Sequence, residues 1–266
     1  MTFARRFPGA FVWLTFAVAL YVNVALLEPN APLLPLPLSQ SVAVTVGMLL
    51  FAVAHSIRLI GGRTTAIFFV IAAVVSWLFE QVGVASGFVY GAYHYGDQLG
   101  AKLGHVPILI PLAWFMMIYP SYVIASLIFD GRPFAVGGGT ARILWRAILA
   151  GMVMTAWDIV IDPGMAASGV WTWEHGGPYF GVPLRNFAGW MLTTVTVYIL
   201  WGVLARRVER IASTTSLAIL PVICYAVLTL RYAYYNEHGV LGVVALFAMG
   251  FPALAAFSRA VTPERT

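Results

Sequence analysis

The chain has 266 residues, of which 61% are hydrophobic and only 9% are charged, whereas a soluble domain carries about 25% charged residues. This composition leaves too little polar surface for a soluble helical core and favours a polytopic helical membrane protein. The net charge of +5 comes almost entirely from arginines scattered singly between apolar runs, so we interpret it as a topology signal and expect no nucleic-acid partner.

Eight apolar runs approach the length of about 20 residues that a helix needs to cross a bilayer. The pattern predicts one all-α integral-membrane domain over 1–266, with about eight transmembrane helices. The predicted spans are 10–27, 41–57, 65–85, 106–129, 141–161, 184–205, 215–235 and 239–258.

The basic residues divide unequally between the two sides of the predicted membrane. Alternate loops counted from the N-terminus place twelve on one side: Arg5, Arg6, Arg58, Arg63, Arg132, Arg142, Arg146, Arg206, Arg207, Arg210, Arg259 and Arg265. The other side holds Lys102, Arg185 and Arg231. Because basic residues gather on the cytoplasmic side, we expect a cell-membrane protein with both termini in the cytoplasm.

A weak internal repeat links the two long, aromatic-rich outer loops, 86–105 and 162–183. The matching pairs are Glu80 and Asp162, Ala85 and Ala167, Ser86 and Ser168, Gly87 and Gly169, Pro107 and Pro183, and Trp114 and Trp190. This spacing predicts that spans three and four are a parallel copy of spans five and six. Such repeats often frame a site between them, which would place Glu80 opposite Asp162.

Asp158 and Asp162 lie four residues apart near the outer end of span five, so they project from one face of a helix. Two partly desolvated carboxyl groups resist ionising together, and we expect one to hold its proton near neutral pH. A neutral buried acid suits a reaction that needs a strong proton donor. Alternatively, Asp162 caps a helix end before Pro163 and Asp158 hydrogen-bonds a neighbouring span.

Two further polar residues lie at the same depth. Glu80, near the outer end of span three, is placed to reach the same chamber; alternatively it pairs with Arg185 or a tyrosine hydroxyl. Asn186, at the start of span six, is placed to orient a water or an acid; alternatively it caps its helix. His55, at the cytoplasmic end of span two, is expected to contact lipid headgroups.

Aromatic residues are denser near these acids than interfacial anchoring requires. Their clustering suits an apolar polyene, or a carbocation held over ring faces. The candidates are Tyr90, Tyr93, Tyr95, Trp114, Trp157, Trp171, Trp173, Tyr179 and Trp190.

Several classes of site are disfavoured. His94, His105 and His175 lack metal-ligand spacing, and the single cysteine, Cys224, excludes a Cys-based cluster, so we expect no metal. A retinal pigment needs a lysine inside a span, whereas Lys102 lies in a loop. A membrane prenyltransferase needs two aspartate-rich motifs, and only the Asp158/Asp162 pair resembles one. The sequence also contains neither a phosphate-binding glycine loop nor a haem bis-histidine pair.

Three segments carry a resemblance to a known family: FEQVGVASGFVYGAYHYGDQLG, VPILIPLAWFMMIYPSYVIA and WDIVIDPGMAASGVWTWEHGGPYFGVPLRNFAGW. They resemble the integral-membrane carotenoid hydratases of the CruF type, which include γ-carotene 1′,2′-hydratases and bisanhydrobacterioruberin hydratases. The resemblance covers roughly residues 75–200, and the flanking spans match only as apolar helices.

The resemblance implies a role in carotenoid biosynthesis: a cofactor-independent enzyme that adds water across the terminal C1′=C2′ bond of an acyclic carotenoid. An acid protonates C2′, and water attacks the tertiary cation left at C1′. Asp162 or Asp158 is then expected to be the acid, and Glu80 or Asn186 to position water.

Two alternatives remain open. Another carotenoid end-group enzyme, such as a cyclase, shares the protonation step. The other alternative is a non-catalytic protein, either a carotenoid- or lipid-binding membrane protein or a transporter. A transporter tends to show spans broken near mid-bilayer.

Overall fold

A computed structural model describes residues 9–25, 39–205, 215–234 and 239–262. The helices are α2 (Gly9–Ala25), α3 (Gln40–Ile60), α4 (Gly62–Ser86), α5 (Leu109–Asp130), α6 (Thr140–Ala167), α7 (Leu184–Leu204), α8 (Thr215–Ala218), α9 (Leu220–Tyr234), α10 (Gly239–Ala248) and α11 (Gly250–Val261). The strands are β1 (Tyr93–Tyr95), β2 (Lys102–Leu103), β3 (Val106–Pro107) and β4 (Trp171–Trp173).

The helices confirm an all-α polytopic membrane fold. Within the described residues, six helical stretches are long and apolar enough to cross a membrane, the last of them formed by α10 with α11. The shorter apolar helices Gly9–Val24 and Leu220–Tyr234 coincide with the first and seventh predicted spans. The count of eight spans and the orientation of the termini therefore stay predictions. Six of the arginines behind that orientation lie outside the described residues: Arg5, Arg6, Arg206, Arg207, Arg210 and Arg265.

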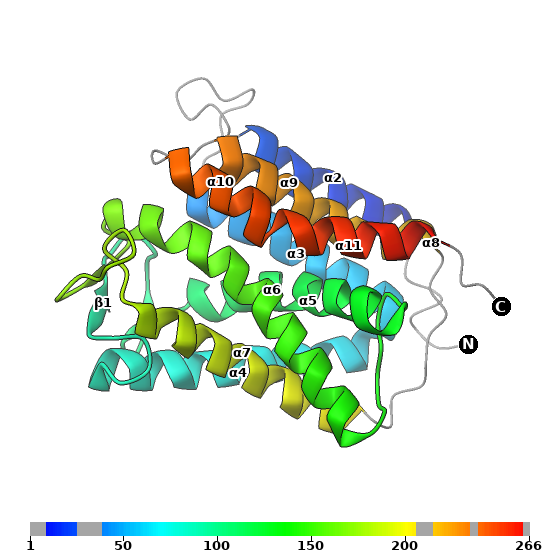
Figure 1. The fold of residues 1–266 in the computed structure, drawn as a ribbon, viewed down its shortest axis with the longest axis horizontal. Helices are drawn as coiled ribbons and strands as arrows, with labels where there is room; N and C mark the ends of the chain where they lie inside the picture. The colour runs from blue at the N-terminus through cyan, green and yellow to red at the C-terminus, as the bar shows by residue number, and fades with distance from the viewer. Residues whose placement is uncertain (1–8, 26–38, 206–214, 235–238, 263–266) are drawn as a thin grey trace.

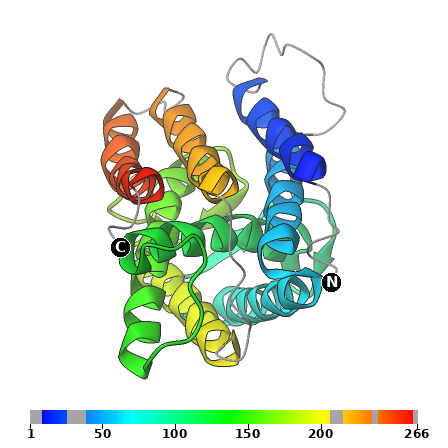
Figure 2. The ribbon, with the colours of Figure 1, turned by 90° about the vertical axis from the view of Figure 1, so that its right-hand side faces the viewer.

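The helices lie roughly along one direction in two layers with α5 between them (Figure 1). In this view α2, α9, α10 and α11 lie along the top, and α4 and α7 along the bottom. Helix α4 packs against α7, and α5 packs against α6. Figure 2, an end-on view, shows α5 crossing the middle of the molecule beneath the α9–α11 group.

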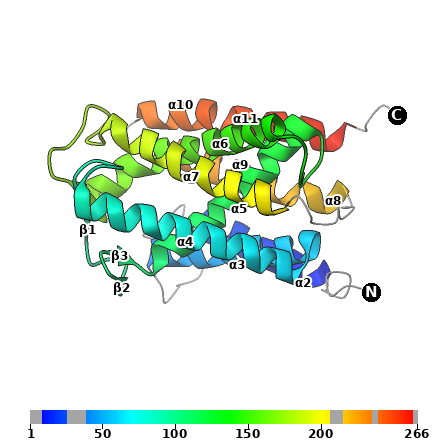
Figure 3. The same ribbon diagram turned by 90° about the horizontal axis from the view of Figure 1, so that it is seen from below.

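The two outer loops begin in the same way and then pair with each other. Each starts with a serine and a left-handed glycine, Gly87 with φ 66° and Gly169 with φ 71°, a conformation that glycine adopts without steric cost. Strands β1 and β4 then run antiparallel, with His94 opposite Thr172 at the centre. These loops gather at one end of the helices, beside β2 and β3 (Figure 3).

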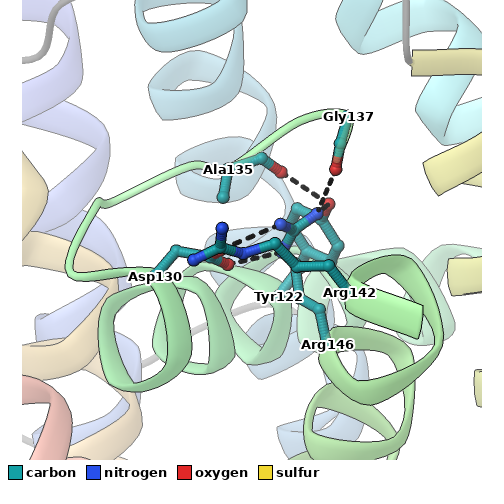
Figure 4. Close-up of polar contacts among 6 residues, drawn as sticks. All are labelled: Tyr122, Asp130, Ala135, Gly137, Arg142 and Arg146. Carbon is teal, nitrogen blue, oxygen red and sulfur yellow. Dashed lines mark hydrogen bonds and ion pairs between the residues drawn. The ribbon is translucent and has the colours of Figure 1, made fainter. Parts of the chain in front are cut away.

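A buried ion pair holds the turn between α5 and α6 (Figure 4). Asp130 receives hydrogen bonds from Arg146 Nε at 2.6 Å and Arg146 Nη2 at 3.0 Å. The same guanidinium reaches the Gly137 carbonyl at 3.4 Å, and the Tyr122 hydroxyl donates to the Ala135 carbonyl at 2.7 Å. The pair and its neighbours thus tie the turn to both helices.

His55 corrects one expectation. It does not contact lipid headgroups but is buried, and both of its ring nitrogens bind protein groups. Nε2 lies 2.7 Å from the Leu217 carbonyl, which only accepts, so Nε2 carries the proton. Nδ1 therefore accepts from the Tyr119 hydroxyl at 2.6 Å. His55 links α3 to α5 and α8.

Replacing Arg146 by Ala is expected to destabilise the fold by about 3–5 kcal/mol, because it leaves the buried Asp130 charge without its main partner. Arg142→Ala is the matched control. It removes a second arginine from the same carboxylate, but the Arg142 side chain is 58% exposed, so the loss should stay within about 1 kcal/mol. Thermal unfolding of both variants in the same detergent measures the difference, and equal losses would contradict the buried-pair interpretation.

Candidate functional site

A cavity of about 150 Å³ lies at the end of the helices where β1 and β4 pair. Residues from α3, α4, α5, α6, α7 and α9, and from strands β1 and β4, line it. It brings together most of the residues singled out from the sequence. Those lining it are Glu80, Tyr90, Tyr93, Tyr95, Trp114, Trp157, Asp162, Trp171, Trp173, Asn186 and Trp190. Segments separated by about a hundred residues therefore form one chamber.

Two predicted site residues do not line this cavity. Tyr179 packs its ring against Phe180 and Phe187, with centroids 5.0 and 5.3 Å apart. Asp158 is fully buried one helical turn from Asp162, and it accepts a hydrogen bond from Asn186, which does line the cavity. Sharing one face of a helix is not enough to place both acids at the same surface.

Glu80 accepts hydrogen bonds from three side chains. The Tyr95 hydroxyl donates to Oε2 at 2.7 Å, the Tyr93 hydroxyl donates to the same oxygen, and Trp114 Nε1 donates to Oε1 at 3.1 Å. The tyrosine partner foreseen for Glu80 is thus present. Arg185 is not its partner and instead lies over the Phe88 ring, 5.8 Å from its centroid.

The two tyrosines keep their protons over the ordinary pH range. Burial, and after it the negative charge of the nearby Glu80 carboxyl, raise the pKa of both Tyr93 and Tyr95 well above the usual tyrosine value. Both phenols therefore remain hydrogen-bond donors to Glu80. The tyrosines bind one oxygen of the Glu80 carboxyl group and Trp114 binds the other, so its orientation is fixed.

Asn186 joins the two aspartates. Its Nδ2 donates to Asp162 Oδ2 at 2.5 Å and to Asp158 Oδ2 at 3.1 Å. Helix α6 runs through Pro163 to Ala167, so the alternative in which Asp162 caps a helix end is wrong. Asn186 does not cap α7 either, because Pro183 is the N-cap residue and the Asn186 amide binds the acids. Asp158 does bond a neighbouring span, as its alternative predicted.

Aromatic rings form the walls of the chamber. Trp114 and Trp190 stack with centroids 4.1 Å apart and an interplanar angle of 17°. Trp157 meets Trp190 edge-on at 5.9 Å, and Tyr93 meets Tyr95 edge-on at 5.4 Å. The faces and edges of these rings surround the acids with apolar surface.

Sequence reasoning missed the contribution of α3 and α9. Ser41 and Thr45 from α3, and Arg231 and Tyr232 from α9, also line the cavity. Arg231 Nη1 donates to Asn23 Oδ1 at 3.3 Å, and Trp157 Nε1 donates to the Tyr232 hydroxyl at 3.4 Å. A signal was available, because an arginine inside an apolar run is costly without a role.

The loop histidines lie apart from this chamber. His94, His105 and His175 are exposed and do not line the cavity. In the described parts of the chain, no group of three or more His, Cys, Asp or Glu side chains is arranged to hold a metal ion. The polar side chains that line the cavity carry carboxyl, amide, hydroxyl, phenol, indole and guanidinium groups.

Comparison with known proteins gives two similarities. A family model described as carotenoid biosynthesis protein matches residues 39–257. Bisanhydrobacterioruberin hydratase of Haloarcula japonica is 34% identical over 132 residues. That match spans 49% of this chain and 42% of the relative, so less than half of the relative's length is covered. Both agree with the resemblance noted in the sequence, and no solved structure matches.

Gly189→Ala is expected to destabilise the protein by about 1–3 kcal/mol, because a Cβ there would lie 2.6 Å from both the Tyr90 ring and the Val89 carbonyl oxygen. Backbone oxygen cannot move aside as a flexible side chain would. Gly164→Ala, in the interior of α6, is the control, since nothing lies within 4 Å of its added Cβ. It should be neutral or stabilising by up to about 1 kcal/mol. Thermal unfolding compares the two, and a loss in both variants would contradict the close approach at Gly189.

Proposed function

Since this chain belongs to the carotenoid biosynthesis protein family, we propose that it adds water across the terminal C1′=C2′ bond of an acyclic carotenoid end and forms a tertiary alcohol. The hydratase relative supports the reaction type. One observation carries the proposal: Asp162 and Glu80, from different helices, face the same aromatic cavity. An acid can supply the proton that the alkene takes up, and a second carboxyl group and ring faces stabilise the cation that protonation leaves.

Asp162 is the proposed acid. It lines the cavity, whereas Asp158 does not. The π electrons of C1′=C2′ take the Asp162 proton and form a C–H bond at C2′, which leaves a tertiary cation at C1′. Water then forms the C1′–O bond, and one of its protons passes to the Asp162 carboxylate. The acid is restored, and the cycle needs no redox cofactor.

Glu80 is proposed to stabilise the cation. Its carboxyl group is held by Tyr93, Tyr95 and Trp114, so it does not have to reorient when positive charge develops. The stacked pair of Trp114 and Trp190 offers aromatic surface, and ring faces attract cations. The rings also exclude bulk water, which strengthens electrostatic interactions inside the chamber.

Asp158 and Asn186 are proposed as positioning residues. Both protons of the Asn186 amide are directed to carboxyl oxygens, one on each aspartate. The bond to Asp162 fixes Oδ2 of that residue and leaves its Oδ1 to face the substrate. Asp158 anchors Asn186 from the buried side.

We also propose that the site lies between two copies of one helix–loop–helix unit within an eight-span domain whose termini are cytoplasmic. The contacts support a two-fold relation: α4 packs on α7 as α6 packs on α5, and β1 pairs with β4 about a central pair. Trp114 and Trp190, matched by the repeat spacing, stack on each other. The matched acids Glu80 and Asp162 line the same cavity.

Replacing Asp162 by Asn in the purified protein should lower conversion of an acyclic carotene by about 100-fold or more, the usual cost of losing a general acid. Glu80→Gln should also lower conversion strongly, and Asp158→Asn should lower it less, because Asp158 does not face the cavity. Products are separated chromatographically and identified by mass, without added nucleotide or partner.

Glu174→Gln is the control, because this carboxyl group is exposed just after β4 and should retain full activity. Full conversion by both the Asp162 and Glu80 variants would refute the carboxyl mechanism. A product of unchanged mass would indicate cyclisation, because hydration adds one water.

A further inference from the structure

Hydrogen bonding within the chamber leaves Glu80 and Asn186, the two residues expected to position water, without a free donor for the oxygen of that water. A carboxylate offers about four lone-pair sites, and three protein donors already bind Glu80. An amide nitrogen carries two protons, and Asn186 directs both to aspartates. A donor to the oxygen of the attacking water therefore has to come from another group in the chamber.

Helix α9 supplies that capacity. Arg231 and Tyr232 line the same cavity from the layer opposite α4 and α7 (Figure 1). The Arg231 guanidinium is held by a hydrogen bond to Asn23, and the Tyr232 hydroxyl is held by one from the Trp157 indole. Among the described residues, Arg231 forms no ion pair with a carboxylate, and the Tyr232 hydroxyl accepts from Trp157 without an acceptor for its own proton. Both therefore retain donors that can point into the cavity.

The charge of the chamber selects a neutral ligand for these donors. Arginine by itself would attract a carboxylate or a phosphate. Here, however, Glu80 and Asp162 line the same cavity and Asp158 lies directly behind, so an anion would meet three carboxyl groups. A small neutral molecule whose oxygen accepts a hydrogen bond fits both sides, and water is the reactant that meets this description.

We propose that Arg231 and Tyr232 form the water-holding site for the hydration reaction, so that the water attacks C1′ from the α9 side. The inference rests on the proposed function. The water oxygen accepts a hydrogen bond from this pair and keeps its other lone pair for C1′. As the C1′–O bond forms, one water proton goes to the Asp162 carboxylate, which had given its proton to C2′.

Loss of this site has a consequence that a structural defect does not reproduce. A cation that finds no water loses a proton from C2′ or from a methyl group on C1′, which restores an alkene. In D₂O the acid carries deuterium, and a failed cycle leaves that deuterium at C2′ whenever the cation loses a protium from C2′ or from a methyl group instead. The ratio of deuterium in the recovered alkene, counting the starting carotene and its double-bond isomer together, to hydrated product therefore measures water capture separately from protonation.

The experiment incubates purified protein with an acyclic carotene in D₂O and measures product and recovered substrate by mass spectrometry. Tyr232→Phe and Arg231→Met should each lower hydration by about tenfold, the effect of roughly one lost hydrogen bond, and raise the ratio of exchange to hydration. Arg231→Lys, which keeps a charged donor, should restore part of the hydration. Tyr225→Phe is the control. It removes a hydroxyl from the same helix, but that hydroxyl donates to the Val153 carbonyl, and neither residue lines the cavity.

Three outcomes would overturn the inference. Hydration and exchange could fall together in the Tyr232 and Arg231 variants, which indicates a structural role only. Both variants could retain wild-type product and exchange. The ratio could change in Thr45→Val but not in the α9 variants, which would place the water on α3. Failure of the proposed function is recognised separately, because wild-type protein would then give neither hydrated product nor deuterium exchange.

Discussion

Three carboxyl groups, those of Glu80, Asp158 and Asp162, lie buried inside an apolar bundle, where a polar group without a hydrogen-bond partner costs several kcal/mol. Donors for them come from other elements: two tyrosines on β1 and an indole on α5 for Glu80, and one amide on α7 for both aspartates. Satisfying the acids therefore draws α4, α5, α6, α7 and an outer loop to one point.

The outer loops serve the same end. Strand β1 presents Tyr93 and Tyr95 to Glu80 only because it is held against β4, and that pairing fixes which side chains face inward. Along β1 the inward residues alternate with the exposed His94, as the two-residue period of a strand requires. The short strands thus convert flexible connections into rigid supports for a buried acid. Rigid support matters to a site in which charge has to develop without rearrangement.

The opposite end of α5 and α6 solves the same problem differently. Asp130 is neutralised by Arg146 in a two-bond ion pair, and this pair ties a turn to its helices. At the cavity, the described residues place no such ion pair on Glu80, Asp158 or Asp162. Asp130 is bound by a cation, whereas the three acids near the cavity are bound by neutral phenol, indole and amide donors. This contrast separates the ion-paired end of the molecule from the end at which we propose the reaction.

The sequence by itself determined the helical membrane architecture and the face of α6 that carries both aspartates, because hydropathy and a period of 3.6 residues are local properties of a chain. The resemblance of three segments to known proteins indicated the family. The sequence also identified most of the chamber, from Glu80 to Trp190, through the density of acids and aromatics. Only the tertiary structure decided that Asp162 faces the cavity and Asp158 does not, that Tyr179 packs elsewhere, and that Arg231 and Tyr232 enter from α9. The reason is physical: a periodic pattern defines the faces of one helix, but the rotation of that helix against its neighbours depends on side-chain packing and hydrogen bonds between distant segments.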